Sequence, residues 1–419
     1  MGWTRRQFLR AGASSVALAS LSCGRRTQDK SAPPVAAPKG IGARYVAILY
    51  LDGGIDPILT VNPRTRDQLA ADVDGPVDPG QIVEAGEIHL GPHFAPLKPW
   101  ASRMAVVNGV HLDTANHNTG WGQITRLRTG VTDRMPGILD ILAEHRDGQP
   151  LGTISFGDLA PIQYTPGHTD GERVFGLHDS NPEQLGDLGA ALEAEAAGMA
   201  AAGQDPRILR TAENYRSIGR LAERLKDVPK FTPAPWSPLG DKDRRIGNSL
   251  QRILWAFEHD LTRCAFIKVR PYGGWDSHNH NLLRQRNTSK ALTEVLVEFL
   301  KQLEGRKNAH GTLADQTLLV IGSEIGRFPR LNDNAGKDHY PETSYLLMGA
   351  GIGRGVFGIT DNRMSGVLVD PDSGKKAMRG GHRIRLDDLG ATVLASVGIA
   401  PEPYGYRGRV LRFLQRRAA

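Results

Sequence analysis

Cysteine is scarce in this chain: Cys23 and Cys264 are the only two among 419 residues. Cys23 lies in an N-terminal segment that we expect to be processed, so Cys264 has no partner within the mature chain. A disulfide framework is therefore excluded. The apolar neighbours Ala265-Phe266-Ile267 favour a buried core thiol at Cys264.

The N-terminus also lacks an apolar run suited to a stable membrane span, because Ala11–Ser22 is short and only weakly apolar. This segment follows a string in which paired arginines precede Phe-Leu, namely Thr4-Arg5-Arg6-Gln7-Phe8-Leu9-Arg10. Such a string before a short apolar segment is typical of a signal that the twin-arginine export machinery reads. We therefore expect export of a folded protein through the inner membrane.

Two alternatives describe the end of this signal peptide, which we place at residues 1–23. Leu18–Gly24 resembles a lipoprotein cleavage box in which Cys23 carries the lipid, although Ser20 stands where such a box usually has Leu. An ordinary small-x-small site at Ala17–Ala19 would instead release a periplasmic product without lipid. The mature protein is thus expected to be periplasmic or a membrane-anchored lipoprotein, with residues 24–40 as a flexible tether.

The chain carries a net charge of +7 and a pI near 9.4, yet it has no nucleic-acid recognition motif. Most of the excess basic residues lie near the two ends of the chain, before residue 40 and after residue 406. Because no aromatic-interleaved basic patch accompanies them, we exclude nucleic acid as a partner.

Short apolar runs bounded by polar or Gly-containing loops recur along the chain and predict buried strands. They are Tyr45–Leu51, Met104–Gly109, Cys264–Val269, Thr317–Ile321 and Tyr345–Met348. Helical patterns alternate with them at Asn118–Leu127, Ser249–Leu261 and Ser289–Leu303. This alternation predicts an α/β domain over residues 41–419 with a largely parallel central sheet and helices on both faces. An Ala-rich block and an amphipathic pattern predict a helical insertion at about 183–240.

Carboxylates and imidazoles, which bind divalent metals, stand at the ends of these predicted strands. In chain order they occur at Asp52, Thr114–Thr119, Asp276–His280, Ser323-Glu324 and Asp338-His339. Ligands of open α/β sheets gather at the carboxyl ends of the strands, so the conjunction indicates a metal site. Asp276 and His280 can reach one ion if their loop curls into a helical turn. His278 is the alternative ligand, or a partner of a ligand.

Four glycine-containing motifs stand in order along the chain: Leu51–Asp56, Gly273–His278, Gly322–Arg327 and Gly336–His339. Together with Gly355–Asp361 and Asp387–Thr392, they resemble the motifs of the domain-of-unknown-function family 1501. The proteins of that family are exported, often by the twin-arginine route, and are grouped with the alkaline phosphatase-like superfamily. The resemblance implies an alkaline phosphatase-like fold for nearly the whole mature chain.

The same resemblance implies metal-assisted displacement at phosphorus or sulfur, with a divalent ion (Zn, Mn, Ca or Mg) as cofactor. It transfers the role of metal ligand to Asp52, Asp276, His280, Glu324 and His339, with His278 and Asp338 as direct ligands or partners of ligands. Glu324 keeps a carboxylate where related sulfatases and phosphatases have Asp. Ile325 replaces an imidazole, which weakens a second metal site.

The nucleophile is expected at a helix N-terminus beyond the second strand, where backbone N–H groups also stabilise an oxyanion. Thr114 and Thr119 offer hydroxyls there, and Asn116 and His117 are alternatives for the same place. A formylglycine sulfatase is unlike this chain, because no Cys or Ser stands in a Cys/Ser-x-Pro-x-Arg context. Arg327 either clamps an anionic substrate or forms a surface ion pair.

Two functions remain as hypotheses. The first is an exported metal-dependent hydrolase that acts on a phosphate or sulfate ester, or a related small anionic or carbohydrate ester, at the cell envelope. The second is a catalytically degenerate protein that binds a carbohydrate or another envelope protein without turnover. The set of Asp, His and Glu residues favours the first, and Ile325 with the missing clear nucleophile favours the second. We favour the hydrolase.

Overall fold

The computed structural model describes residues 42–131, 136–145, 149–157, 168–170, 182–202, 205–234, 236, 241–377 and 379–414. The predicted signal peptide and tether, with Arg5, Arg6 and Cys23, lie outside these residues. The chain forms two compact units. Of the described residues, 149–151, 182–202 and 205–231 belong to the smaller unit, and the others belong to the larger.

The larger unit is built on a mixed eight-stranded sheet with the strand order β14-β4-β13-β10-β1-β7-β5-β6. The strands are β1 (Tyr45–Leu51), β4 (Met104–His111), β5 (Leu151–Phe156), β6 (His168–Asp170), β7 (Thr262–Val269), β10 (Thr317–Gly322), β13 (Glu342–Gly349) and β14 (Gly355–Phe357). β1 pairs in parallel with β7 and β10, whereas β13 is antiparallel to both β10 and β4. The prediction of an α/β fold with a largely parallel sheet is confirmed.

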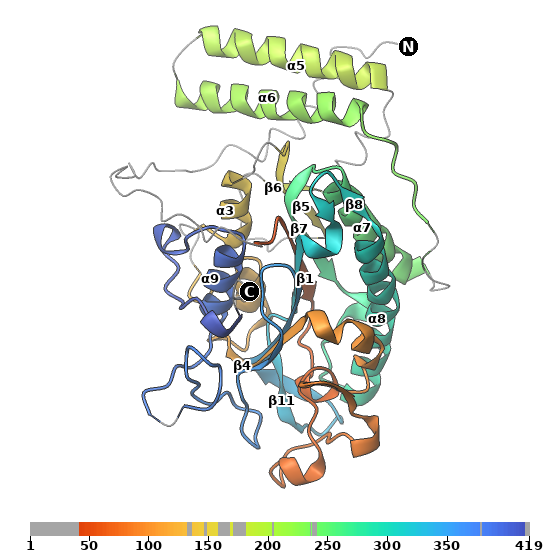
Figure 1. Cartoon of the computed structure of the whole chain (residues 1–419), viewed down its shortest axis with the longest axis vertical. Helices are drawn as coiled ribbons and strands as arrows, with labels where there is room; N and C mark the ends of the chain where they lie inside the picture. Colours follow the sequence, from red (N-terminus) through yellow and green to blue (C-terminus); the bar gives the residue numbers. More distant parts are fainter. Residues whose placement is uncertain are drawn as a thin grey trace. The chain divides into compact units, whose positions relative to one another are not determined.

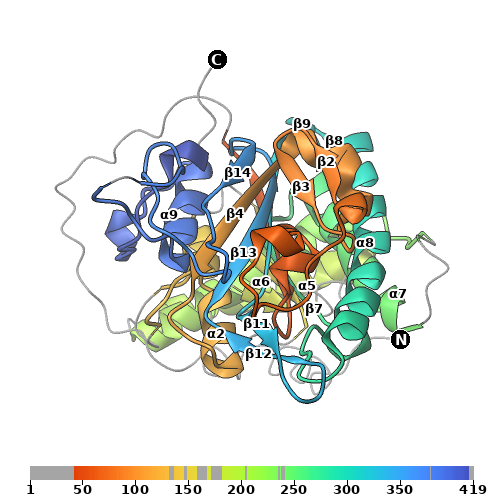
Figure 2. The same cartoon turned by 90° about the horizontal axis from the view of Figure 1, so that it is seen from below.

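Helices cover both faces of this sheet, as the alternating pattern predicts. α3 (Ile138–Glu144) and α9 (Leu386–Ser396) lie on one side of the strands, and α7 (Asp241–Glu258) and α8 (Asn281–Gly305) lie on the other (Figures 1 and 2). Alternate side chains of β1 point to the same face of the sheet. On one face, Val46, Ile48 and Tyr50 therefore join a buried cluster with side chains of α3 and α9.

Short elements complete the larger unit. The helix α2 (His117–Ile124) follows β4, and three two-stranded sheets pair β2 (Val83–Ala85) with β3 (Ile88–Leu90), β8 (Lys307–Asn308) with β9 (Gly311–Thr312), and β11 (Gly326–Leu331) with β12 (Lys337–Tyr340). Single turns of 3-10 helix include Pro57–Leu59 after β1 and Pro271–Gly273 after β7.

The described part of the smaller unit is a pair of helices, α5 (Pro182–Ala202) and α6 (Pro206–Lys226). They approach closely where two glycines meet, because a Cβ on Gly219 would lie 3.2 Å from the carbonyl oxygen of Gly189. Among the described helices of both units, none is long and apolar enough to cross a membrane.

A buried ion pair joins the loop after β1 to the start of β12. Lys337 Nζ lies 2.9 Å from Asp56 Oδ2, and each side chain is only 1% exposed. Asn281 Nδ2 donates to the same oxygen at 2.9 Å, and Lys337 also donates to the carbonyl of Asp74 at 3.1 Å. Desolvation makes such a pair costly unless every partner is present, so removing one member should leave a buried unpaired charge.

We expect Lys337→Met to lower the free energy of unfolding by about 3–5 kcal/mol, because Asp56 then stays buried and unpaired. The double variant D56N/K337M should recover most of this loss. Urea unfolding followed by circular dichroism measures both. Lys301→Met is the matched control, since Lys301 is 59% exposed and its 3.7 Å pair with Glu298 should be worth less than about 1 kcal/mol. Equal losses for K337M and K301M would contradict the prediction.

Candidate metal centre

Loops that follow four strands meet at one edge of the sheet. β1, β7 and β10 are parallel, and β4 runs the same way because β13 is antiparallel to both β4 and β10. The chain beyond these strands carries Asp52, Asp276, Glu324 and His117, so strand direction brings these four residues to the carboxyl edge. The β11–β12 hairpin follows β10 and lies near α2 in Figure 2. Its residue His339 contacts the carbonyl of Ala115 in the loop before α2.

Three imidazoles and one carboxylate converge at this edge. His117, Asp276, His278 and His339 each offer a ligand atom, and these atoms all lie within 4.8 Å of one another. Asp276 Oδ1 is 3.7 Å from His117 Nε2 and 3.5 Å from His278 Nε2, and the Nε2 atoms of His278 and His339 are 2.8 Å apart. Such a set of nitrogen and oxygen atoms suits a divalent transition metal.

The opposite ring nitrogen of each histidine has its own partner. His117 Nδ1 lies 2.6 Å from Glu324 Oε1, His278 Nδ1 lies 2.9 Å from Asp338 Oδ1, and His339 Nδ1 lies 2.7 Å from the carbonyl of Ala115. All three partners are acceptors, so each Nδ1 carries the proton and donates it. This tautomer leaves the lone pair of each Nε2 for a metal, which is the arrangement seen around histidine ligands in general.

His117 Nε2 shows whether these four side chains suit a metal ion. Its 3.7 Å separation from Asp276 Oδ1 is too long for a hydrogen bond, and this buried nitrogen has no hydrogen-bond partner among the described residues. A buried polar atom without a partner is costly, unless a group absent from the polypeptide satisfies it. A metal ion between His117, Asp276 and the other two histidines does so, and the four groups therefore fit a divalent metal.

Charges within the cluster shift its pKa values in opposite directions. Burial lowers the pKa of His117, but the neighbouring Asp276 and Glu324 outweigh it and raise that pKa to about 9. Burial and the charges of His117 and Arg327 lower the pKa of His339. His117, with Arg327, also holds the pKa of Asp276 well below its usual range. Without metal, the cluster therefore keeps a proton on His117.

Glu324, predicted as a metal ligand, lies outside the four-residue cluster and contacts one of its members, His117. Its side chain is fully buried, and its carboxylate accepts from the backbone N–H of Gly53 at 2.9 Å as well as from His117. Burial raises the pKa of Glu324. Ile325 is also buried. The Ser323-Glu324-Ile325 segment thus contributes a carboxylate that orients His117 and an apolar side chain that packs, rather than direct ligands.

Arg327 does not serve as the substrate clamp or surface pair that the sequence predicts. Its side chain is completely buried, and it donates to the carbonyls of Gly53, Gly54 and Lys337 as well as to Asp276 Oδ1, the last at 2.9 Å. Every nitrogen of the guanidinium is thereby engaged within the protein. Arg327 is a positioning residue for Asp276.

Asp52 lies outside the four-residue cluster, unlike the prediction. Its carboxylate accepts from the Tyr50 hydroxyl at 2.7 Å and faces two cations, with Arg270 Nε at 3.1 Å and Lys268 Nζ at 3.7 Å. A carboxylate between two cations is a poor ligand for a further dication. Asp52 is thus part of an ion-pair network beside the centre.

His278, rather than His280, completes the centre. His280 is exposed and stands before α8 in a left-handed conformation, with φ of 49°, so its loop does not form the helical turn that pairs Asp276 with His280. Asp338, 59% exposed, takes the role of partner to His278. The sequence predicts both His278 and His280 as candidates. Which of them reaches the cluster depends on the path of the backbone between Asp276 and α8.

The predicted nucleophile segment forms the start of α2. Asn116 is the N-cap, and its side chain accepts from the N–H groups of Asn118 and Thr119. Thr114 Oγ1 accepts from the N–H of Asn116 at 3.1 Å, and Thr119 is exposed in the first turn. His117, offered as an alternative nucleophile, is a metal ligand candidate. None of the hydroxyls is fixed on an ionisable base in the described contacts.

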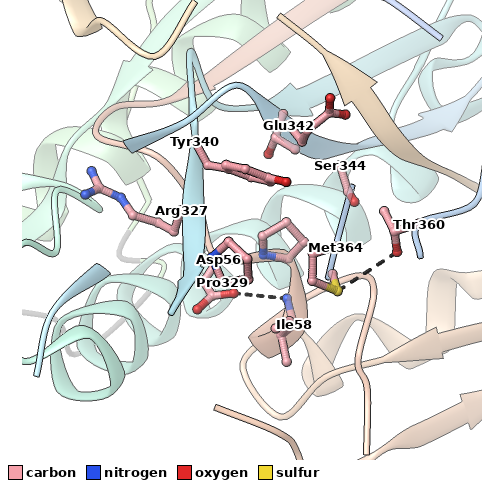
Figure 3. Close-up of a pocket in the computed structure, with 11 residues that line it drawn as sticks. Asp56, Ile58, Arg327, Pro329, Tyr340, Glu342, Ser344, Thr360 and Met364 are labelled. Atoms are coloured by element: carbon pink, nitrogen blue, oxygen red, sulfur yellow. Dashed lines mark hydrogen bonds between the residues drawn. The ribbon is translucent and has the colours of Figure 1, made fainter. Parts of the chain in front are cut away.

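A small cavity borders Arg327. Asp56, Arg327, Pro329, Tyr340, Glu342 and Met364 are among its lining residues (Figure 3). It has room for about one water molecule. None of the four ligand candidates lines it, so substrate access is expected at the half-exposed centre itself rather than through this cavity.

Metal affinity should depend on pH through His117. Because its pKa is about 9 without metal, an ion must displace a proton at neutral pH to reach Nε2. The apparent association constant for Zn²⁺, measured against a competing chelator, should rise roughly tenfold per pH unit from about pH 7 to 8.5. Glu324→Gln should flatten this dependence, because Glu324 raises the pKa of His117. A wild-type affinity independent of pH across this range would refute the assignment of His117.

Comparison with other proteins places the chain in a family but adds no detail of the site. Among solved structures, it resembles a 2-O GAG sulfatase (11% identity, TM-score 0.38, covering 90% of this chain and 76% of that one). It also resembles the lipoteichoic acid synthase of Listeria monocytogenes (10% identity, TM-score 0.39, covering 89% of this chain and 76% of that one). A further likeness is a protein in the alkaline phosphatase superfamily from Vibrio parahaemolyticus (10% identity, TM-score 0.37, covering 95% of this chain and 76% of that one). Likenesses at such TM-scores carry no conclusion about activity.

No curated protein matches the chain in sequence. Residues 162–418 match the family model described as "Protein of unknown function (DUF1501)". The match includes Asp276, His278 and His339 of the four-residue cluster, and it covers more than half of the chain. In agreement with its ordered motifs, the chain belongs to the DUF1501 family.

Proposed function

We propose that this protein is an exported metal-dependent hydrolase of phosphate or sulfate esters that acts at the cell envelope. The observation that carries the proposal is the convergence of three imidazole Nε2 atoms and Asp276 Oδ1, with every Nδ1 already held by an acceptor. An arrangement in which the ligands are oriented by their own partners is typical of metal centres rather than of chance clusters of polar residues.

The donor set narrows the choice of metal. Three imidazole nitrogens and one carboxylate disfavour Ca²⁺ and Mg²⁺, which take oxygen ligands, and favour Zn²⁺ or Mn²⁺ among the expected ions. When bound, a divalent ion supplies a Lewis acid that polarises the ester oxygen and makes water a better nucleophile near neutral pH.

The protein itself supplies access and orientation. Asp276 and His278 are 43% and 41% exposed, so an ester in solution can reach the centre. Glu324 holds His117, and Arg327 holds Asp276, so the ligands keep their geometry when a substrate approaches. Because Thr114 accepts a hydrogen bond from the helix cap and no described base contacts Thr119, we assign the role of nucleophile to water.

The rival function is binding without turnover, and one observation favours it. Asp52, which resembles a metal ligand of catalytic relatives, is paired with Lys268 and Arg270 instead. A centre without this ligand would retain a metal for structure while it binds a carbohydrate or an envelope protein. The experiment below separates the two functions because it measures metal content and turnover on the same protein.

Turnover should require the residues of the cluster and not their neighbours. Purified protein loaded with Zn²⁺ or Mn²⁺ is assayed with aryl phosphate monoesters, aryl phosphate diesters and aryl sulfates. Asp276→Ala and His278→Ala should lose bound metal and lower turnover by roughly a hundredfold or more. His280→Ala, which removes an exposed histidine two residues away, should retain both.

Each result has a distinct meaning. Turnover that survives Asp276→Ala would point to a contaminating enzyme. Metal content that depends on the cluster, without turnover of any tested ester, would favour the binding function. Loss of metal in H280A but not in H278A would reverse the assignment of the ligands.

Export forms the second part of the proposal, and it rests on the N-terminal sequence alone. Replacing Arg5 and Arg6 together by Lys should keep the protein in the cytoplasmic fraction, because the receptor reads the arginine pair. Labelling with a fatty-acid analogue should mark the wild type and not Cys23→Ala if the cysteine is lipidated. Periplasmic wild-type protein without label would assign cleavage at Ala17–Ala19 instead.

A further inference from the structure

A buried ammonium group lies near the carboxyl end of β7, the strand whose following loop carries Asp276 and His278. Lys268, near the end of β7, pairs in register with Tyr50 of β1, and its side chain is only 11% exposed. Its Nζ lies 3.6 Å from the centre of the Trp121 ring and 3.7 Å from Asp52 Oδ1. A lysine held between an indole face and a carboxylate has little freedom to move, so its charge is fixed in position.

Short links join this lysine to the metal ligands. Trp121 lies one helical turn after His117 on α2, and residues four apart share a helix face. Asp52 accepts from the Tyr50 hydroxyl, and after burial the charges of Glu324 and Asp52 raise the pKa of Tyr50. The Tyr50 hydroxyl therefore keeps its proton. It interacts with the carboxylate of Asp52, which faces Lys268, and with that of Glu324, which contacts His117.

The surroundings of Asp52 do not fit a second metal ion, although the superfamily resemblance implies one. Arg270 and Lys268 both face its carboxylate, and two cations repel a dication at that place. In the described part of the chain, only the cluster of His117, Asp276, His278 and His339 gathers enough ligand atoms for an ion. The predicted partner His280 is exposed elsewhere, and Ile325 offers no donor.

We propose that Lys268, positioned by Asp52, supplies the second positive charge of the site, so that the centre takes one metal ion and the ammonium binds a substrate oxyanion. This inference rests on the proposed hydrolysis of phosphate or sulfate esters. It assigns Lys268 the part of an anion-binding residue for a tetrahedral oxyanion. Asp52 is a positioning residue, and Arg270, whose side chain is 58% exposed, adds positive charge at the rim.

Metal stoichiometry tests the first part. Wild-type protein and the variants D52N and D276A are loaded with Zn²⁺, freed of excess ion and measured by elemental analysis. One ion per chain in the wild type and in D52N, with loss in D276A, is the expected result. Two ions per wild-type chain, or loss of the ion in D52N, would overturn the proposal.

Anion binding tests the second part. Inorganic phosphate and sulfate are titrated into Zn²⁺-loaded protein in a calorimeter, without any ester present. Lys268→Met should weaken binding of the anion by roughly tenfold to a hundredfold, while Lys268→Arg restores most of it because the positive charge returns. Metal content should stay at one ion in both variants. Equal anion affinity in the wild type and K268M, or no anion binding by the loaded wild type, would overturn the assignment.

Folding and function are separated by two controls. D52N/K268M removes both members of the pair and avoids leaving Asp52 uncompensated, so it should melt near the wild type while still binding the anion weakly. If the wild type binds one ion and the anion but hydrolyses no ester, the proposed function fails and the Lys268 assignment stands. If K268M hydrolyses esters with an unchanged KM, the proposed function stands and the Lys268 assignment fails.

Discussion

The buried guanidinium of Arg327 holds the candidate centre together. It donates to the carbonyls of Gly53 and Gly54 in the loop after β1, to the carbonyl of Lys337 at the start of β12, and to Asp276 in the loop after β7. A charge without solvent is tolerated only when each donor finds an acceptor, so the three loops must lie where they do for Arg327 to be buried. The ligand candidates are thereby placed by contacts within the protein itself.

The main sheet could be predicted from the sequence because its strands are short apolar runs that end at polar or glycine residues. β1 spans Tyr45–Leu51, as predicted, since all seven residues are buried and Asp52-Gly53-Gly54 follows, with φ of 112° and 86° at the two glycines. The direction of β13 could not be predicted. An apolar run is equally compatible with parallel and antiparallel pairing, and the reversal arises because the β11–β12 hairpin replaces a crossover helix between β10 and β13.

The sequence indicates which residues gather at this edge of the sheet, but not which of them belong to the four-residue cluster. Asp52, Asp276 and Glu324 all follow strands and carry the same functional group, so local sequence cannot rank them as ligands. The distinction comes from partners distant in sequence: Lys268 and Arg270 for Asp52, and His117 for Glu324. The choice between His278 and His280 depends likewise on the left-handed turn before α8, which a non-glycine residue rarely signals in advance.

These partners divide the edge of the sheet into two regions of opposite charge. Around the four ligand atoms, the carboxylates of Asp276, Glu324 and Asp338 outnumber the single guanidinium of Arg327, which favours a dication. Around Asp52, two cations outnumber one carboxylate, which favours an anion. In the proposed hydrolysis of an ester with a tetrahedral oxyanion, the first region would hold the Lewis acid at one oxygen and the second would place a cation at another, without a second metal ion.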